Sequence, residues 1–268
     1  MLTQSQIDFY HENGYLHIPE LFTPEETTEL SDEMDRLVED WAFTNPGWRG
    51  PWRQAYMDVE TEKLSKLTAM HDLQLYSMAW MKAVTNLKLA KAMSQLIGPD
   101  VELHHSTMHI KPPQTGHPFP MHQDHPFYAH EDERFIDVLV HLDDTNAENG
   151  EIRFLPGSHK QGALKHIIET DDGPCEPHLP TDEWKLADTV PVPAKRGDVV
   201  IFCYHTVHGS YINQTKHPRR LVRIGFRNPH NKQQYGYATG RPGLMVHGYR
   251  EREEGQEMLT AINNIIKD

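Results

Sequence analysis

The sequence is poor in cysteine, with only Cys175 and Cys203 among its 268 residues. Two cysteines are too few for a disulfide framework or for a four-cysteine zinc site. The chain also lacks any apolar run near the roughly 20 residues that a membrane span requires. Residues 1–20 contain neither the basic nor the apolar region of a signal peptide. These absences predict a cytoplasmic protein with no membrane partner.

Basic residues are in the minority as well. The 26 Lys and Arg residues against 39 Asp and Glu give a formal net charge of −13. Because phosphate backbones require a basic protein surface, this charge argues against a nucleic-acid partner. It leaves room for one anionic ligand in a local basic pocket. Histidine, in contrast, is abundant at 19 residues, so an isolated histidine motif carries little information.

The length fits a single domain over residues 1–268 with a sizeable core. Residues 1–98 have helical patterns, with N-terminal signals at Thr3 and Thr23 and a stop at Gly98 after a segment that breaks near Asn86. A loop over residues 43–58 carries two Trp and two Arg residues. We expect it either to pack locally or to form a lid over a substrate.

Residues 99–227 have a different texture, in which short apolar runs alternate with turns. Such spacing is typical of an antiparallel sandwich, jelly roll or barrel. The polar segment 161–188 is expected to be an insertion or lid between strands, and residues 228–268 an extension with a closing helix over 255–267. The expected strands cover 101–111, 135–142, 152–155, 190–192, 199–207 and 221–226.

Three His-x-Asp/Glu triplets occur, which is about the number that chance predicts for this composition. His130 lies in a run of charged residues, so we predict a surface position for it. His141 ends an expected strand, which favours a structural role. His122 and Asp124 follow a stretch rich in Pro and Gly, and as residues i and i+2 of a strand they would point to one face.

A second histidine near this pair is expected from the apolar run that ends in His205 and His208. These two have opposite parity on a strand, so both could face one metal only across a bulge. Two histidines and one carboxylate leave about half of a metal's coordination positions open, which suits non-haem Fe(II) that binds a cosubstrate and oxygen. A structural zinc site would instead be closed by four ligands.

Several blocks in this order resemble the phytanoyl-CoA dioxygenase (PhyH) family of Fe(II)/2-oxoglutarate-dependent oxygenases. The resemblance covers about residues 98–226 and adds an opening block at Phe9–Tyr15. It implies a mainly β fold with flanking helices (α+β), in which the N-terminal helices pack on the major sheet of a double-stranded β-helix (jelly-roll or cupin-like) core. The blocks are Gly98-Pro99, Lys111-Pro112-Pro113, His122-Gln123-Asp124, Glu148-Asn149-Gly150, Leu155-Pro156-Gly157-Ser158-His159, Lys195-Arg196-Gly197-Asp198 and His208-Gly209-Ser210 with Arg219.

The resemblance also implies a role for each matching residue. His122, Asp124 and His208 would ligate Fe(II) and serve as the catalytic centre. Arg219 would hold the distal carboxylate of 2-oxoglutarate, because a planar guanidinium can pair with a carboxylate through two hydrogen bonds. Arg223 shares the face of Arg219 on a strand and is its rival, although the offset from His208 favours Arg219.

Two further residues match family positions that contact the cosubstrate. Ser210 would support Arg219, with a simple turn residue as the alternative. Lys111 would contact 2-oxoglutarate directly, with a surface lysine as the alternative.

The resemblance implies hydroxylation of an unactivated C–H bond of a small-molecule metabolite by O2, with 2-oxoglutarate converted to succinate and CO2. Desaturation, epoxidation or ring-forming oxidation with the same cofactors is the alternative. A non-catalytic metal- or ligand-binding jelly-roll protein is another, and a zinc or manganese hydrolase leaves Arg219 unexplained. Neither the substrate nor the oligomeric state, monomer or homodimer, follows from the sequence. Candidate substrate contacts are Trp48, Trp52, Gln123, Phe127, Tyr128 and Arg227.

Overall fold

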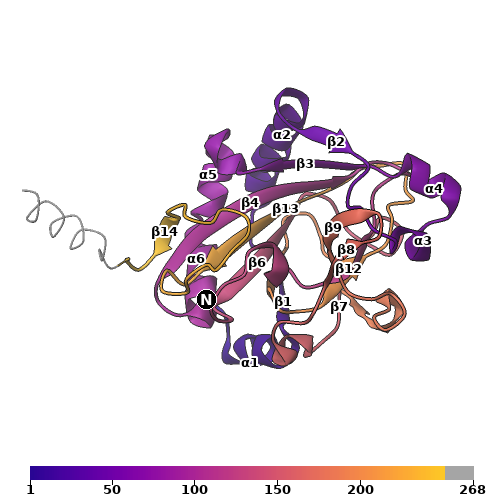
Figure 1. The fold of residues 1–268 in the computed structure, drawn as a ribbon. Helices are drawn as coiled ribbons and strands as arrows, with labels where there is room; N and C mark the ends of the chain where they lie inside the picture. The colour runs from indigo at the N-terminus through magenta and orange to yellow at the C-terminus, as the bar shows by residue number, and fades with distance from the viewer. Residues whose placement is uncertain (251–268) are drawn as a thin grey trace, which may run out of the picture.

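A computed structural model describes residues 1–250 of the protein. Its largest element is an antiparallel β-sheet in the strand order β1-β11-β6-β13-β4-β3-β2, with β14 paired to β4. The long strands β4 and β13 form its centre (Figure 1). Its strands are β1 (Tyr15–Ile18), β2 (Phe43–Asn45), β3 (Leu67–His71), β4 (Val101–Lys111), β6 (Phe135–His141), β11 (Val199–Cys203), β13 (Arg219–Arg227) and β14 (Leu244–His247).

A smaller sheet in the order β10-β7-β12-β5 packs against this one. It consists of β5 (Phe119–His122), β7 (Arg153–Phe154), β10 (Val190–Pro191) and β12 (His208–Ser210). A separate pair, β8 (Ile167–Thr170) and β9 (Gly173–His178), lies within the predicted insertion. The loop after β9 buries Leu179 and Leu186 against Met121 and Val207, and so supports the strands of the smaller sheet.

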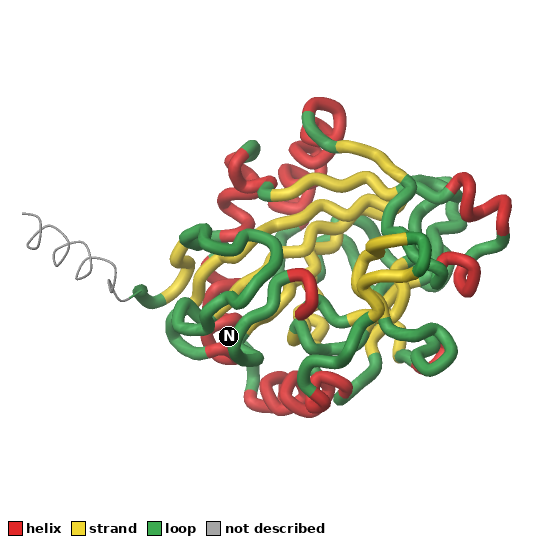
Figure 2. The backbone as a smooth tube through the Cα atoms, viewed as in Figure 1, coloured by secondary structure: helices red, strands yellow, loops and turns green. Residues whose placement is uncertain are grey.

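The helices lie mostly in the N-terminal part (Figure 2). Those at residues 24–40, 78–84 and 87–97 pack on the outer face of the large sheet, whereas the one at residues 53–56 contacts the smaller sheet. Capping boxes at Thr3 and Thr23 begin the first two helices of the chain, as the sequence predicts. The helices are α1 (Gln4–Asn13), α2 (Pro24–Asp40), α3 (Arg53–Tyr56), α4 (Val59–Leu64), α5 (Met78–Val84) and α6 (Leu87–Ile97), with short 3-10 turns η1 (Leu73–Leu75), η2 (His125–Phe127), η3 (Ser158–Gln161) and η4 (Leu186–Asp188).

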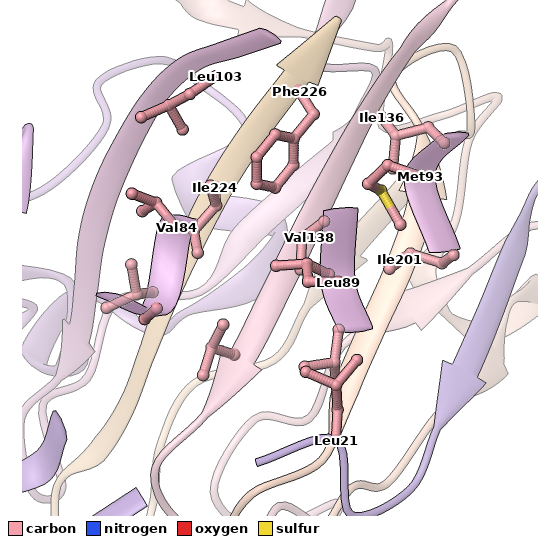
Figure 3. Close-up of a cluster of buried hydrophobic side chains, with 14 of the residues drawn as sticks. Leu21, Val84, Leu89, Met93, Leu103, Ile136, Val138, Ile201, Ile224 and Phe226 are labelled. Atoms are coloured by element: carbon pink, nitrogen blue, oxygen red, sulfur yellow. The ribbon is translucent and has the colours of Figure 1, made fainter. Parts of the chain in front are cut away.

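Side chains of the large sheet alternate between its two faces and so contribute to two separate hydrophobic clusters. Leu89 and Met93 of α6 pack on the outward-facing residues of the central strands, among them Val138 and Ile224 (Figure 3). The neighbouring inward residues of the same strands, such as Leu139, face the smaller sheet. Because side chains alternate across a sheet, one face buries helices and the other is left to build a cavity between the sheets.

The mainly β fold class with helices on the major sheet is confirmed. The helical segment before Gly98 breaks as expected, since Asn86 caps α6 with its side chain. The single strand predicted over 199–207 was wrong, because β11 ends at Cys203 and the chain turns to the other sheet before β12 begins at His208. The helix predicted over 255–267 lies outside the described residues. Among the helices of residues 1–250, none has both the length and the apolar character to cross a bilayer.

Candidate active site

Three buried side chains meet where β5 pairs with β12. His208 is the direct antiparallel partner of His122, which places the centroids of their rings 4.2 Å apart. Oδ1 of Asp124 lies 3.4 Å from Nε2 of His122 and 3.9 Å from Nε2 of His208. The potential ligand atoms of the three residues therefore lie within 4.8 Å of one another.

Asp124 reaches this position by a turn rather than along a strand. β5 ends at His122, and Asp124 has helical backbone angles, φ −78° and ψ −20°, where η2 begins. Its amide donates to the carbonyl of Tyr204 at 3.0 Å, which ties the turn to the segment that precedes His208. The expectation that i, i+2 strand alternation brings the two side chains together was wrong, although the side chains do converge.

Both histidines present the same nitrogen to this cluster. Nδ1 of His122 donates to the carbonyl of Pro120 at 2.7 Å, and Nδ1 of His208 donates to the carbonyl of Thr206 at 2.9 Å. Since a carbonyl oxygen can only accept, each Nδ1 carries the proton and each Nε2 keeps its lone pair. Burial, together with the nearby His122, lowers the pKa of His208 to about 3, which favours the neutral form that binds metals.

The carboxylate of Asp124 provides the test of whether a metal fits. It is fully buried, and within residues 1–250 its Oδ1 has no hydrogen-bond partner, whereas Oδ2 is paired with Arg223. Burial would raise its pKa, but the charge of Arg223, whose Nη1 lies 2.7 Å from Oδ2, acts together with His208 and His122 to hold the pKa well below its usual range. An ionised Oδ1 that faces two imidazole lone pairs is compensated only by a cation between them. Two nitrogens and one oxygen with open positions match the donor set of non-haem Fe(II).

A cavity of about 480 Å³ opens beside these three residues, between the two sheets. This volume is in the range of small-molecule sites. Its apolar wall includes Trp48, whose ring lies 4.8 Å from that of His122 and 5.0 Å from that of Phe119. Its polar wall includes Arg219 and Arg223 of β13.

The Arg219 end of the cavity collects positive charge. Lys111 pairs with Arg219 in the register of β4 and β13, and Nζ of Lys111 donates to Oγ of Ser210 at 2.7 Å and to the carbonyl of Tyr211. Burial lowers the pKa of Arg219 to about 10, and burial and Arg219 hold the pKa of Lys111 well below its usual range. Nε of Arg219 has no partner among the described residues. A carboxylate placed here would satisfy both cations.

The six candidate substrate contacts separate into two groups. Trp48 lines the cavity, the ring of Phe127 lies 5.0 Å from that of Trp48, and the hydroxyl of Tyr128 donates to Asp137 at 2.8 Å behind Arg223. Of the six, Trp48 alone is among the residues that line the cavity within residues 1–250. The last three are held elsewhere: Trp52 lies edge-on against the ring of His117, Gln123 donates to the carbonyls of Gly162 and His205, and Arg227 is paired with Glu102.

The two other His-x-Asp/Glu histidines lie away from the cluster. The surface position predicted for His130 was wrong, because its side chain is buried, with Nδ1 donating to the carbonyl of Tyr128 and Nε2 next to Arg227. The charged run around His130 in the sequence does not show that Arg227 of β13, which is distant in sequence, lies against its ring. His141 lies buried in β6, as the strand pattern predicts. The ring of His205 lies 4.8 Å from that of His125, and His205 is not part of the candidate metal-binding cluster.

Sequence reasoning missed two residues near the site, Asp137 and His109. Asp137 is fully buried beside Arg223, and a single acid inside the apolar run of β6 was the available signal, because buried charges require partners. His109 lines the cavity, and its even spacing from Lys111 on one strand was the signal that both share a face.

A double-stranded β-helix with two histidines and a carboxylate beside a buried cationic pocket has the features of non-haem Fe(II)/2-oxoglutarate-dependent oxygenases. The chain belongs to the phytanoyl-CoA dioxygenase (PhyH) family, whose sequence profile matches residues 10–221. The predictions of the family, of the enzyme class, and of Fe(II), 2-oxoglutarate and O2 as its cofactors are therefore confirmed.

Relatives named for related activities span most of the chain. An ectoine dioxygenase of Bordetella parapertussis is 28% identical in an alignment of 254 residues that covers 88% of this chain and 79% of that protein. A probable alpha-ketoglutarate-dependent hypophosphite dioxygenase of Stutzerimonas stutzeri is 29% identical and covers 81% of this chain and 76% of its own. A methylphosphonate hydroxylase of Gimesia maris is 25% identical, in an alignment that covers 84% of this chain and 80% of that protein.

Solved structures share the fold. The carbocyclase SnoK from nogalamycin biosynthesis superposes with a TM-score of 0.69 at 20% identity, over 92% of this chain and 94% of SnoK. EctD from S. alaskensis, solved with 2-oxoglutarate and 5-hydroxyectoine, superposes with a TM-score of 0.68 at 21% identity, over 93% of this chain and 86% of EctD. These likenesses are evidence for the architecture, in agreement with the strand order described above.

Proposed function

We propose that His122, Asp124 and His208 hold the Fe(II) of this oxygenase, and that Arg219, with Ser210 and Lys111, holds the distal carboxylate of 2-oxoglutarate. The observation that carries this assignment is the complementarity of one cavity. Its lining contains, first, the buried carboxylate of Asp124, whose Oδ1 has no hydrogen-bond partner in the described chain. It contains, second, the buried Arg219, and neither Arg219 nor its strand partner Lys111 has a carboxylate within ion-pair distance there. A metal satisfies the first and a dicarboxylate the second.

Bound iron supplies the oxidative decarboxylation of 2-oxoglutarate and the activation of O2. The chain's own residues prepare that chemistry. The carbonyls of Pro120 and Thr206 fix the imidazole tautomers, so that both Nε2 lone pairs are available before the metal arrives. Arg219 and Lys111 orient the cosubstrate, and Trp48 over His122 restricts the access of water.

The reaction we propose is hydroxylation of an unactivated C–H bond of a small metabolite, with release of succinate and CO2. The relatives named for ectoine, hypophosphite and methylphosphonate support a small substrate, and a cavity of about 480 Å³ fits one. The protein would act in the cytoplasm on a free small molecule, without a nucleic-acid or membrane partner. The net charge of −13 supports the absence of a nucleic-acid partner.

An anaerobic titration tests the site. Fe(II) and then 2-oxoglutarate are added to metal-free protein, and the weak visible charge-transfer band of the chelate is recorded. We expect the band in the wild type and its loss in Asp124→Ala. In Arg219→Ala we expect it only at far higher 2-oxoglutarate. Bound Fe(II) without a band would overturn the assignment in favour of a metal-binding protein without oxygenase chemistry. Succinate release against a substrate panel then tests the reaction.

A further inference from the structure

The cavity wall formed by β4 and β13 carries a second positive end. In the antiparallel register Arg219 pairs with Lys111, Leu221 with His109 and Arg223 with Thr107. Arg219, Leu221 and Arg223 all line the cavity, because alternate residues of a strand share a face. Arg223 therefore lies about 13 Å along the strand from Arg219, at about 3.3 Å per residue, and next to Asp124.

2-Oxoglutarate leaves this second end unpaired. It has two carboxylates. One is part of the 2-oxo acid group that would chelate the metal, and the other would pair with Arg219 in the assignment above. No third anionic group remains for Arg223. The cavity wall thus holds one more cation than metal and cosubstrate account for.

Arg223 is held rigidly, and one of its nitrogens stays available. Nη1 lies 2.7 Å from Oδ2 of Asp124 and donates to the hydroxyl of Tyr128 at 3.1 Å, while Nε lies 3.8 Å from Oδ1 of Asp137. The structure gives Nη2 no hydrogen-bond partner within residues 1–250. The side chain keeps 13% exposure and lines the cavity. The guanidinium is therefore ordered before any ligand arrives, which lowers the entropic cost of binding.

His109 adds a neutral donor on the same wall. Its ring lies 5.4 Å from that of Phe119, and no hydrogen bond of either ring nitrogen is found in the described part of the chain. Burial and the charge of Arg223 lower the pKa of His109 well below its usual range, so the ring is neutral and keeps one N–H to donate. Arg223 and His109 together offer a charged and a neutral donor to one anionic group.

The charges of the site agree with such a ligand. Two arginines, Arg219 and Arg223, and one carboxylate, Asp124, line the cavity. Fe(II) and the 2-oxoglutarate dianion cancel each other, so one positive charge remains in a largely dry cavity. A monoanion bound at Arg223 would compensate it, and an uncompensated buried charge is costly.

We infer that Arg223 and His109 bind the anionic group of the substrate, and that the substrate is a small aliphatic monoanion, a carboxylate or phosphonate. Its alkyl part would lie against Trp48 and Phe119, with a C–H bond directed at the metal cluster. The cavity of about 480 Å³, which also holds the cosubstrate, fits a small substrate. This inference rests on the proposed function and narrows its substrate class.

The test uses the anaerobic holoenzyme with Fe(II) and 2-oxoglutarate bound. Propionate and ethylphosphonate serve as anionic probes, propionamide as the neutral isostere of propionate, and potassium chloride as the ionic control. We expect the two anions to shift the charge-transfer band in a saturable way, with apparent Kd values at least tenfold lower than that of propionamide. Chloride should cause no shift. An equal response to propionamide or chloride would overturn the inference while leaving the cosubstrate site intact. Failure of the wild type to form the band would remove the proposed function and this inference together.

Matched variants on one strand locate the anion site. Arg223→Leu should lower the affinity for the anionic probes at least tenfold, and Arg223→Lys should recover part of this loss of affinity. Arg220→Leu is the control, because Arg220 points away from the cavity and pairs with Asp143 and Asp35. Should Arg223→Leu disturb the band itself through Asp124, His109→Leu provides an independent test. Unchanged affinity in both Arg223→Lys and His109→Leu would place the anion elsewhere.

Discussion

Arg219 and Lys111 are direct partners in the register of β13 and β4, and both are almost completely buried. Two like charges side by side in a dry cavity are costly unless an anion joins them. The ordered contact of Lys111 with Ser210 holds one cation toward the other. The pair is therefore prepared for a ligand carboxylate.

Replacing Arg219 should selectively weaken the binding of the cosubstrate 2-oxoglutarate. A hydrogen bond to a charged group contributes about 1.5–3 kcal/mol, so Arg219→Leu should raise the KM for 2-oxoglutarate about ten- to a hundredfold. The check is succinate release at varied 2-oxoglutarate, with Arg220→Leu as the control on the outer face of the same strand. A larger rise in Arg223→Leu than in Arg219→Leu would show that the carboxylate anchor is misassigned.

Each of His122, Asp124 and His208 should be required for the metal. Asp124→Asn keeps the shape but removes the charge that compensates the cation, and His122→Ala and His208→Ala each remove a nitrogen donor. We expect loss of stoichiometric Fe(II) binding in the metal-reconstituted protein and no 2-oxoglutarate-dependent succinate release. His205→Ala, which alters a histidine outside the cluster, is the matched control. Normal turnover in any of the three ligand variants would contradict the assignment.

Gly150 should influence 2-oxoglutarate binding through Lys111. A Cβ at this position would clash with the carbonyl oxygen of Tyr211 and lie 2.9 Å from Nζ of Lys111, at a φ of +75°. Gly150→Ala should therefore displace the ammonium group and raise the KM for 2-oxoglutarate severalfold. Gly162→Ala separates backbone strain from this contact, because its φ is +67° and a Cβ there meets nothing within 4 Å. Equal kinetic effects in both variants would exclude the Lys111 explanation.

Buried histidines should make the metal-free protein sensitive to acid. Burial, with the charge of Arg219, lowers the pKa of His141 to about 4, and neither ring nitrogen has a hydrogen-bond partner within the described chain. The unfolded chain takes up a proton near its ordinary pKa of about 6.5, whereas the folded state resists protonation until about pH 4. Stability should thus fall between these values by up to about 1.4 kcal/mol per pH unit for this residue.

Urea unfolding at pH 7 and pH 5 measures this contribution. His141→Leu removes the titration and the unpaired ring nitrogens, so its loss of stability between the two pH values should be smaller than that of the wild type by about 1–2 kcal/mol. His230→Leu, which replaces an exposed histidine with the same residue, is the matched control. Identical pH slopes in the wild type and His141→Leu would show that the buried ring does not resist protonation.

Local patterns were sufficient for much of the fold. The capping residues Thr3 and Thr23 and the break at Asn86 define helix boundaries through contacts within a few residues. The strand Val101–Lys111 likewise follows from its own apolar pattern. The crossing of the chain between sheets after Cys203 could not be predicted in this way, because the apolar run continues through the turn.

The sequence by itself determined the ordered blocks that place the chain in its family, and with them the iron and 2-oxoglutarate chemistry. The tertiary structure decided which charges face each other. His130, within a run of charges, is buried under Arg227, and Asp124 comes to His122 by a turn anchored on Tyr204. The register of β4 and β13 separates Arg219 from Arg223 and gives each a different neighbour. Such pairings join residues about 80 to 110 positions apart. The energy of a buried charge depends on these partners rather than on its neighbours in sequence.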